Sequence, residues 1–236
     1  MDEAFLRTEM LLGTPAMEKL SHSHVAVMGL GGVGSWCAEA LARSGVGTLT
    51  LVDCDTVSVS NLNRQLEATR DTVGMAKSRA MAERIAQIAP ACDLRPMDFR
   101  YAPEDRERFF SAGPFDYIVD AIDVVSCKLD LIETALGRGV PIVSALGTGN
   151  KLDPTKFRIT DLSKTEMCPL ARVIRRELRG RGVEHHRVLW SPEEPLTPED
   201  REAPPPGRRS VPGSVAWVPS CAGLMLAGDV VLSLIG

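Results

Sequence analysis

The chain has 236 residues, of which 44% are hydrophobic and 25% are charged, and its formal net charge is −4. This composition excludes a disordered chain and allows one α/β domain with a substantial core. The six cysteines include no Cys-x-x-Cys pair, which argues against a disulfide framework and against a zinc ribbon. A net negative charge gives no overall attraction to nucleic acid, so such a contact would need a local basic patch.

The N-terminal segment has no basic region followed by an apolar run, as a signal peptide would. We also expect no segment to approach the about 20 apolar residues that span a bilayer. The sequence therefore predicts a cytoplasmic protein with no membrane contact.

The first 150 residues alternate short apolar runs with segments of helical periodicity. Strands are predicted at 24–28, 48–53, 93–97, 117–123 and 140–145, with helices after a glycine turn at 29–34 and over 75–89 and 126–138. Repeated strand and helix units of this kind are typical of a doubly wound sheet. We therefore predict an α/β fold with a Rossmann-like, mostly parallel sheet.

The rhythm becomes irregular after residue 149. Short strands are predicted at 157–160, 187–190 and 214–217, an amphipathic helix around 170–178, and a buried terminal helix at 222–235. Residues 191–213 are rich in proline and charge, and we expect them to form a mobile surface loop. The prediction is a single domain over 1–236, with a Rossmann-like part at 1–150 and a C-terminal part at 151–236 for substrate or dimer contacts.

The glycine turn has the spacing of a nucleotide-binding loop, with glycines at Gly29, Gly31, Gly32 and Gly34. Glycines let the backbone approach phosphate, and the helix that follows offers its N-terminal amides. Asp53 ends the next predicted strand, where ribose hydroxyls would lie. A glycine turn used only for tight helix packing is the alternative explanation.

A dense polar segment after Asp53 distinguishes between two classes of nucleotide. It contains Asp55, Asn61, Arg64 and Gln65, and Lys77 opens the next helix. A nicotinamide dinucleotide has no use for so many charges beside its ribose, whereas a triphosphate needs cations near its terminal phosphate and carboxylates for magnesium. The segment favours ATP.

These motifs together resemble those of the ubiquitin-activating-type (ThiF-like) adenylyltransferases. They are Gly-x-Gly-Gly-x-Gly at 29–34, Asp-x-Asp-Thr-Val at 53–57, Ser-Asn-Leu-Asn-Arg-Gln at 60–65 and Gly-x-x-Lys at 74–77. The resemblance implies that Asp53 binds ribose, that Asn61 and Arg64 contact phosphates, and that Lys77 steadies the β/γ end of ATP. Asp55 and Gln65 match as supporting residues.

The same resemblance implies two further features. Asp123 would coordinate Mg²⁺, and Arg7 lies where the family carries an arginine that reaches into the ATP site of a partner subunit. A homodimer is therefore implied. Taken singly, such residues are often only helix caps or surface cations. The resemblance depends on all of them occurring together, in the order and spacing of the family.

Within that superfamily the chain resembles the tRNA threonylcarbamoyladenosine dehydratases. The resemblance rests on Ala-Ile-Asp at 121–123, Gly-Thr-Gly-Asn-Lys-Leu-Asp-Pro-Thr at 147–155, Lys-Thr at 164–165 and Cys-Pro-Leu-Ala-Arg at 168–172. It implies ATP-dependent adenylation of the threonyl carboxylate on modified tRNA, followed by ring closure with loss of water. The alternatives are an adenylyltransferase that activates the Gly-Gly end of a small sulfur-carrier protein, and a noncatalytic nucleotide-binding scaffold.

Several accessory features stay open. Cys168 and Cys221 are either structural or reactive thiols, and a sulfur-transfer partner and a monovalent cation site are left undecided. The four histidines are expected at the surface.

A basic stretch offers the local patch that tRNA would need. Arg172, Arg175, Arg176 and Arg179 are predicted to lie on one helix, away from its apolar face. Arg208 and Arg209 in the proline-rich loop are further candidate contacts. The alternative is an ordinary solvated helix face.

Overall fold

The computed structural model describes residues 3–199, 201 and 211–236. Its seven strands form one sheet in the order β3-β2-β1-β4-β5-β7-β6. The strands are β1 His24–Met28, β2 Thr48–Asp53, β3 Asp93–Asp98, β4 Tyr117–Asp120, β5 Ile142–Ala145, β6 Arg158–Asp161 and β7 Arg187–Trp190. Every pairing is parallel except that of β6 with β7. The predicted Rossmann-like, mostly parallel α/β fold is confirmed.

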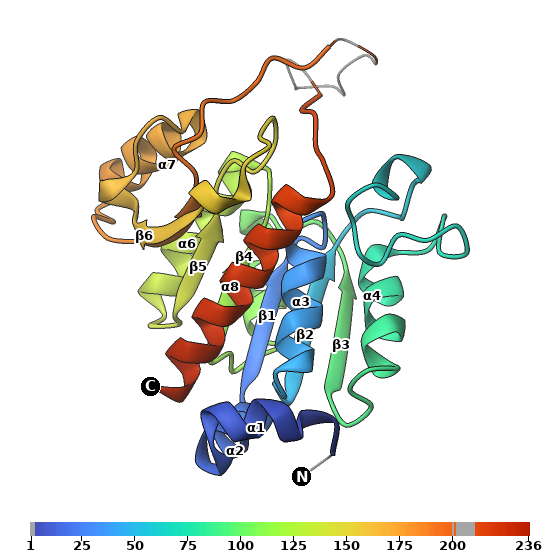
Figure 1. Cartoon of the computed structure of the whole chain (residues 1–236). Coiled ribbons are helices and arrows are strands. Elements are labelled where there is room, and N and C mark those ends of the chain that lie inside the picture. Colours follow the sequence, from blue (N-terminus) through green and yellow to red (C-terminus); the bar gives the residue numbers. More distant parts are fainter. Residues whose placement is uncertain (1–2, 200, 202–210) are drawn as a thin grey trace.

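Helices pack on both faces of this sheet and beneath the amino ends of its strands. They are α1 Leu6–Leu12, α2 Thr14–His22, α3 Gly34–Arg43, α4 Lys77–Ala86, α5 Arg106–Phe110, α6 Val125–Gly137, α7 Pro169–Gly180 and α8 Trp217–Ile235. Alternate residues of β1 enter two different cores, with Val25 and Val27 facing α3 and α8, and Ala26 and Met28 facing α6 and α7. Figure 1 shows α3 and α8 crossing one face of the strands.

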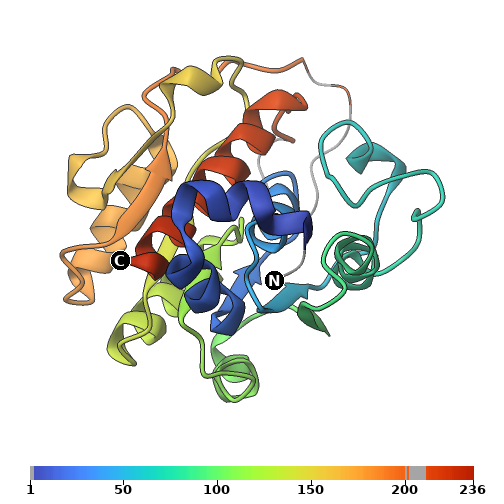
Figure 2. The same ribbon diagram turned by 60° about the horizontal axis from the view of Figure 1, so that its bottom comes forward.

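The two ends of the sheet carry different elements. Helices α1 and α2 lie beneath the amino ends of the central strands, as the turned view shows (Figure 2). These two helices and α5 are not predicted from the sequence. The carboxyl ends of β1, β2 and β4 meet at the opposite edge, where the glycine turn lies.

Helix α8 corrects two predictions. The strand expected at 214–217 is wrong: Gly213 O accepts a hydrogen bond from Asn150 N and Ser214 O one from the Asn63 side chain, and α8 then begins at Trp217. Pro219 fits there because the first turn of a helix needs no donor from it. A Cβ at Gly223 would overlap Val33 O, so this glycine lets α8 pack closely on α3.

The expectation that no segment approaches membrane-spanning length is also wrong for α8. Its 19 residues are long and apolar enough by length and composition, with a mean hydropathy of 1.8. However, Ala222, Leu226 and Val230 are completely buried in the core that α8 shares with α3. Here α8 is a core helix.

The C-terminal part continues the sheet of the N-terminal part, because β7 pairs with β5 and β6 pairs with β7. The division of the chain near residue 150 stays a prediction. Among the described residues of 191–213 the structure has no helix or strand. Arg208 and Arg209 lie outside the described residues.

Candidate functional site

The glycine turn connects β1 to α3 and is shaped by close backbone contacts. Gly29 has φ +87, and a Cβ there would lie 2.8 Å from Ala121 O; a Cβ at Gly34 would overlap Gly29 O. Packing alone thus requires glycine at both positions. A Cβ at Gly31, in contrast, would meet only the Gln65 amide at 3.8 Å, which leaves the backbone of the turn open to a ligand. A Cβ at Gly32 would lie 3.1 Å from Pro219 Cβ, in α8.

Asp53 joins the end of β2 to this turn. Its Oδ2 accepts a 2.6 Å hydrogen bond from Leu30 N, and its Oδ1 accepts one of 2.8 Å from Asp55 N. Each carboxylate oxygen keeps a lone pair that a ribose hydroxyl could use. The predicted ribose-binding residue therefore lies beside the predicted phosphate loop.

The polar segment between β2 and α4 is a loop whose two ends are joined by hydrogen bonds. An isolated bridge pairs Thr56 with Ala76, and Lys77 N donates to Asp55 O at 3.0 Å. Lys77 is 6% exposed, and its Nζ lies 3.4 Å from Asp55 Oδ2. The motif that carries Asp55 and the motif that carries Lys77 thus meet in space.

Asn61 and Arg64 occupy the short 3-10 turn Val59–Asn61 and the residues after it. The buried Asn61 accepts from Ser58 N through Oδ1 at 3.0 Å, so this oxygen caps the turn. Arg64 Nη1 donates to Ser60 O and to Asn63 Oδ1, both at 2.8 Å. The Arg64 stem lies near the glycine turn, because its Cγ is 3.5 Å from where a Cβ on Gly32 would be.

Asp123 is exposed and follows β4 at the same edge of the sheet. The segment that carries it is held from below by buried Asp120, whose Oδ1 accepts from Ile122 N at 3.0 Å. Asp120 also forms a 2.6 Å ion pair with Lys128, and Ser144 Oγ donates to its carboxylate at 2.6 Å. Sequence reasoning missed this pair, although a lysine inside the apolar pattern of α6 was a usable signal.

Two of the four histidines are buried, so the expectation that all four lie at the surface is wrong. His24 is 8% exposed and bonded to Thr50 Oγ1, and His186 is 3% exposed and bonded to Ser144 Oγ. Ser144 gives its proton to Asp120, so His186 Nε2 is the donor and Nδ1 carries no proton. Burial first, and the nearby Lys128 charge second, lower the pKa of His186 to about 3.

Arg7 is not brought to this site. It is exposed on α1, which lies across the amino ends of the strands, away from the glycine turn (Figure 2). Three apolar neighbours on α1 are also exposed: Leu6 by 52%, Met10 by 77% and Leu11 by 88%.

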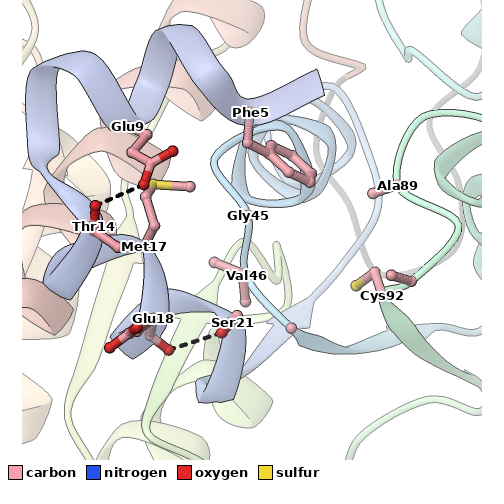
Figure 3. Close-up of a pocket in the computed structure, with 12 residues that line it drawn as sticks. Phe5, Glu9, Thr14, Met17, Glu18, Ser21, Gly45, Val46, Ala89 and Cys92 are labelled. Atoms are coloured by element: carbon pink, nitrogen blue, oxygen red, sulfur yellow. Dashed lines mark hydrogen bonds between the residues drawn. The ribbon is translucent and has the colours of Figure 1, made fainter. Parts of the chain in front are cut away.

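A cavity of about 550 Å³ also lies at the amino ends of the strands. Figure 3 shows Phe5, Met17, Val46 and Cys92 around it, from the 3-10 helix Glu3–Phe5, from α2 and from the loops at this end of the sheet. Because it lies at the opposite edge from Asp53 and Lys77, it is separate from the candidate nucleotide site.

The basic helix α7 presents three of its four candidate arginines to solvent. Arg172, Arg176 and Arg179 are exposed. Arg175 differs from the prediction, because its Nη1 donates to Thr165 O and to Thr165 Oγ1, both at 2.7 Å. The apolar face is formed by Ala171, Ile174 and Leu178, and Val173 is partly exposed.

The two cysteines have different surroundings. Cys168 is buried at the residue before α7, whereas Cys221 is half-buried within α8. A Cβ on Gly147 would lie 3.2 Å from Cys168 Sγ, so this thiol packs against the Gly-Thr-Gly segment. Their roles stay open.

Comparison with known proteins identifies the family. A family model described as the ThiF family matches residues 5–235. The chain belongs to the ThiF family. Within this family it is 43% identical over 240 residues to the tRNA threonylcarbamoyladenosine dehydratase of Bacillus subtilis, covering 98% of this chain and 94% of that protein. The enzyme of the same name from Escherichia coli is 44% identical over 177 residues, 75% of this chain and 66% of that protein.

Solved structures show a likeness to the same dehydratase. The E. coli tRNA N6-threonylcarbamoyladenosine dehydratase in complex with ATP matches with a TM-score of 0.89 and 36% identity, covering 99% of this chain and 94% of that chain. The complex of that enzyme with AMP matches with the same TM-score and 35% identity. The resemblance inferred from the sequence motifs is therefore confirmed.

Proposed function

We propose that the chain is an ATP-dependent tRNA threonylcarbamoyladenosine dehydratase. The observation that carries this proposal is the match, over nearly the whole length of both chains, to a dehydratase structure that binds ATP and AMP. A bound AMP is what adenylation chemistry leaves behind, whereas a kinase or a simple ATPase leaves ADP. A tRNA substrate makes the cytoplasm the expected compartment.

The reaction begins with a carboxylate, which is a poor electrophile. One oxygen of the threonyl carboxylate attacks the α-phosphorus of ATP, the bond to the β-phosphate oxygen breaks, and pyrophosphate leaves. A nucleophile within the same modified base then attacks the activated carbonyl carbon, and the bond to AMP breaks. One oxygen of the substrate leaves on AMP and the nucleophile loses its proton, so the cyclic product is one water lighter than the carboxylic acid.

The protein's part in this chemistry is positioning and charge neutralisation. Asp53 would hold the ribose, and the open backbone at Gly31 would face phosphate. The Lys77 ammonium is already paired with the Asp55 carboxylate, and a triphosphate would compete with Asp55 for it. Arg64 would turn from Ser60 O toward the phosphates, because its present partners are neutral.

Asp123 is the residue we propose as a Mg²⁺ ligand. An exposed carboxylate at the carboxyl end of β4 fits this ion, which proteins commonly hold through one or two carboxylates together with substrate phosphates. When bound, Mg²⁺ would neutralise phosphate charge. The Asp120 and Lys128 pair keeps the segment that carries Asp123 in place.

We further propose a homodimer in which Arg7 serves the partner's site. Arg7 lies at the opposite end of the sheet from the glycine turn of its own chain. The exposed Leu6, Met10 and Leu11 beside it form an apolar surface that a second copy would cover. An Arg7→Ala chain mixed with a Lys77→Ala chain tests this. Recovery of activity on mixing is expected, and no recovery would contradict a shared site.

The adenylation step is tested with ATP labelled at the α-phosphate, Mg²⁺ and tRNA carrying the threonylcarbamoyl group. Labelled AMP is the expected product, and its release should depend on that tRNA. Labelled ADP without AMP would reject adenylation. Release of AMP only with a small carrier protein ending in Gly-Gly would support the carrier-protein alternative instead.

A further inference from the structure

Glu67 is a buried acid beside the candidate nucleotide site. It is 1% exposed, and its carboxylate oxygens make no hydrogen bond of normal geometry, although its own backbone N–H and the Ser35 hydroxyl lie near them. Its backbone is fixed to the glycine turn, because Leu66 N donates to Ser35 Oγ at 3.1 Å and Ser35 Oγ donates to Gly31 O at 2.7 Å. A buried polar group without partners is costly, so its charge state depends on its neighbours.

The charges that act on Glu67 come from two neighbouring elements. The Lys77 ammonium, at the start of α4, attracts a negative charge on Glu67, whereas Asp53, at the end of β2, repels one; α3 contributes only the Ser35 hydroxyl. Burial raises the pKa of Glu67 to about 7, against the opposing effects of its own backbone N–H, of Lys77 and of the Ser35 hydroxyl. The single ammonium of Lys77 therefore faces two carboxyl groups, on Asp55 and Glu67, while Asp53 is near enough to repel a charge on Glu67.

We propose that Glu67 is the proton-accepting counter-charge of this site, so that binding of ATP beside Lys77 draws a proton from solvent onto the Glu67 carboxyl. The inference rests on the proposed function and adds a proton-linked positioning residue to it. A triphosphate brings several negative charges and takes the Lys77 ammonium as its partner. An ionised Glu67 would then be buried with no compensating cation, and protonation removes that repulsion.

The sign of the effect follows from linkage. Because the ATP complex holds more protons than the free protein, ATP affinity falls as the pH rises. The dissociation constant should increase by up to about tenfold per pH unit, from the pKa of Glu67 in the free protein up to its higher value in the complex. Below pH 6 the carboxyl is protonated in both states, and this dependence ends.

Titration calorimetry on the full chain tests the proposal with Mg²⁺ and ATP between pH 6 and 8.5, in buffers of different ionisation enthalpy. The terminal phosphate of ATP also titrates, so the wild type is compared with Glu67→Gln, which keeps the shape and removes the charge. Glu39→Gln is the matched control, because Glu39 is a buried acid of α3 that pairs with Arg43 and Arg84 instead. The wild type and Glu39→Gln should take up more protons per ATP than Glu67→Gln and should show the steeper dependence on pH.

The outcomes separate this inference from the proposed function. If all three chains bind ATP with equal proton uptake and equal dependence on pH, Glu67 is not the proton acceptor and the proposed function stands. If none of them binds ATP, both fail. Should Glu67→Gln not fold, infrared difference spectra of the wild type give the answer: ATP should produce a new protonated-carboxyl band at pH 8, and its absence overturns the inference.

Discussion

Lys128 and Asp120 form a buried ion pair, with Nζ 2.6 Å from Oδ2 and with side chains that are 1% and 0% exposed. Lys128 Nζ also donates to Ala145 O at 3.1 Å, and Ser144 Oγ supplies a further hydrogen bond to the carboxylate. The pair thus connects α6 to the carboxyl ends of β4 and β5, directly below the segment that carries Asp123.

Lys128→Met should be strongly destabilising, because it leaves the Asp120 carboxylate buried without its cation. A loss of about 3–5 kcal/mol in the free energy of unfolding is expected, measured by urea denaturation. Asp120→Asn combined with Lys128→Met should recover part of that loss, since no unpaired charge remains. A single variant as stable as the wild type would mean that the pair does not hold this edge together.

Lys77→Ala and Arg64→Ala should each lower kcat/KM by a factor on the order of a hundred or more, as the loss of one preorganised charged contact usually does. Steady-state AMP release gives the rates. Arg70→Ala is the control, because Arg70 is an exposed cation of the same loop between β2 and α4. Rates within twofold of the wild type for either site variant would remove that residue from the phosphate site.

The free energy of unfolding should depend on His186 at acid pH. Its folded pKa of about 3 lies below its unfolded value of 6.5, so its contribution is fully present above pH 6.5 and is lost as the pH falls from there toward 3. In His186→Leu the loss of unfolding free energy between pH 7.5 and 5 should be smaller by about 2 kcal/mol. His22→Gln, at an exposed position, should behave as the wild type. An unchanged loss in His186→Leu would show that this histidine is not buried in its neutral form.

The exposed arginines of α7 are predicted to bind tRNA phosphates. Replacing Arg172, Arg176 and Arg179 by alanine should weaken tRNA binding and lower the slope of log Kd against log salt by about two to three. ATP affinity and thermal stability should change little. Arg175→Ala should instead lower stability, because it removes the contacts to Thr165. If the triple variant binds tRNA as tightly as the wild type at every salt concentration, the phosphate contacts lie elsewhere.

Much of the fold was readable because parallel strands are buried on both faces and are therefore apolar throughout. Strands β1, β2 and β7 were predicted to the residue, and β3 was found although its edge position leaves it largely exposed. Helices α1 and α2 were missed because they are short and pack on one side only. The strand expected at 214–217 failed because its β-forming residues bond to loops rather than to a sheet edge.

The sequence predicts those residues of the site that belong to a motif with a recognisable residue type and spacing. Asp53 ends β2 beside the glycine turn, and Asp55 and Lys77 meet close by, because the two ends of the segment between β2 and α4 are joined at Thr56 and Ala76. Glu67, Lys128 and His186 were not identified, because a polar residue in a sequence gives no sign that its side chain is buried. Their importance comes from tertiary neighbours, which the pattern of a single chain does not contain.

Conversion of the modified nucleoside in tRNA can be followed directly by mass spectrometry of nucleosides. The chain is incubated with ATP, Mg²⁺ and tRNA that carries threonylcarbamoyladenosine, and the tRNA is then digested under mild conditions that preserve the cyclic product. The modified nucleoside is expected to lose the mass of one water in an amount that matches the AMP released. ATP turnover with an unchanged nucleoside mass, or no turnover with this tRNA, would contradict it.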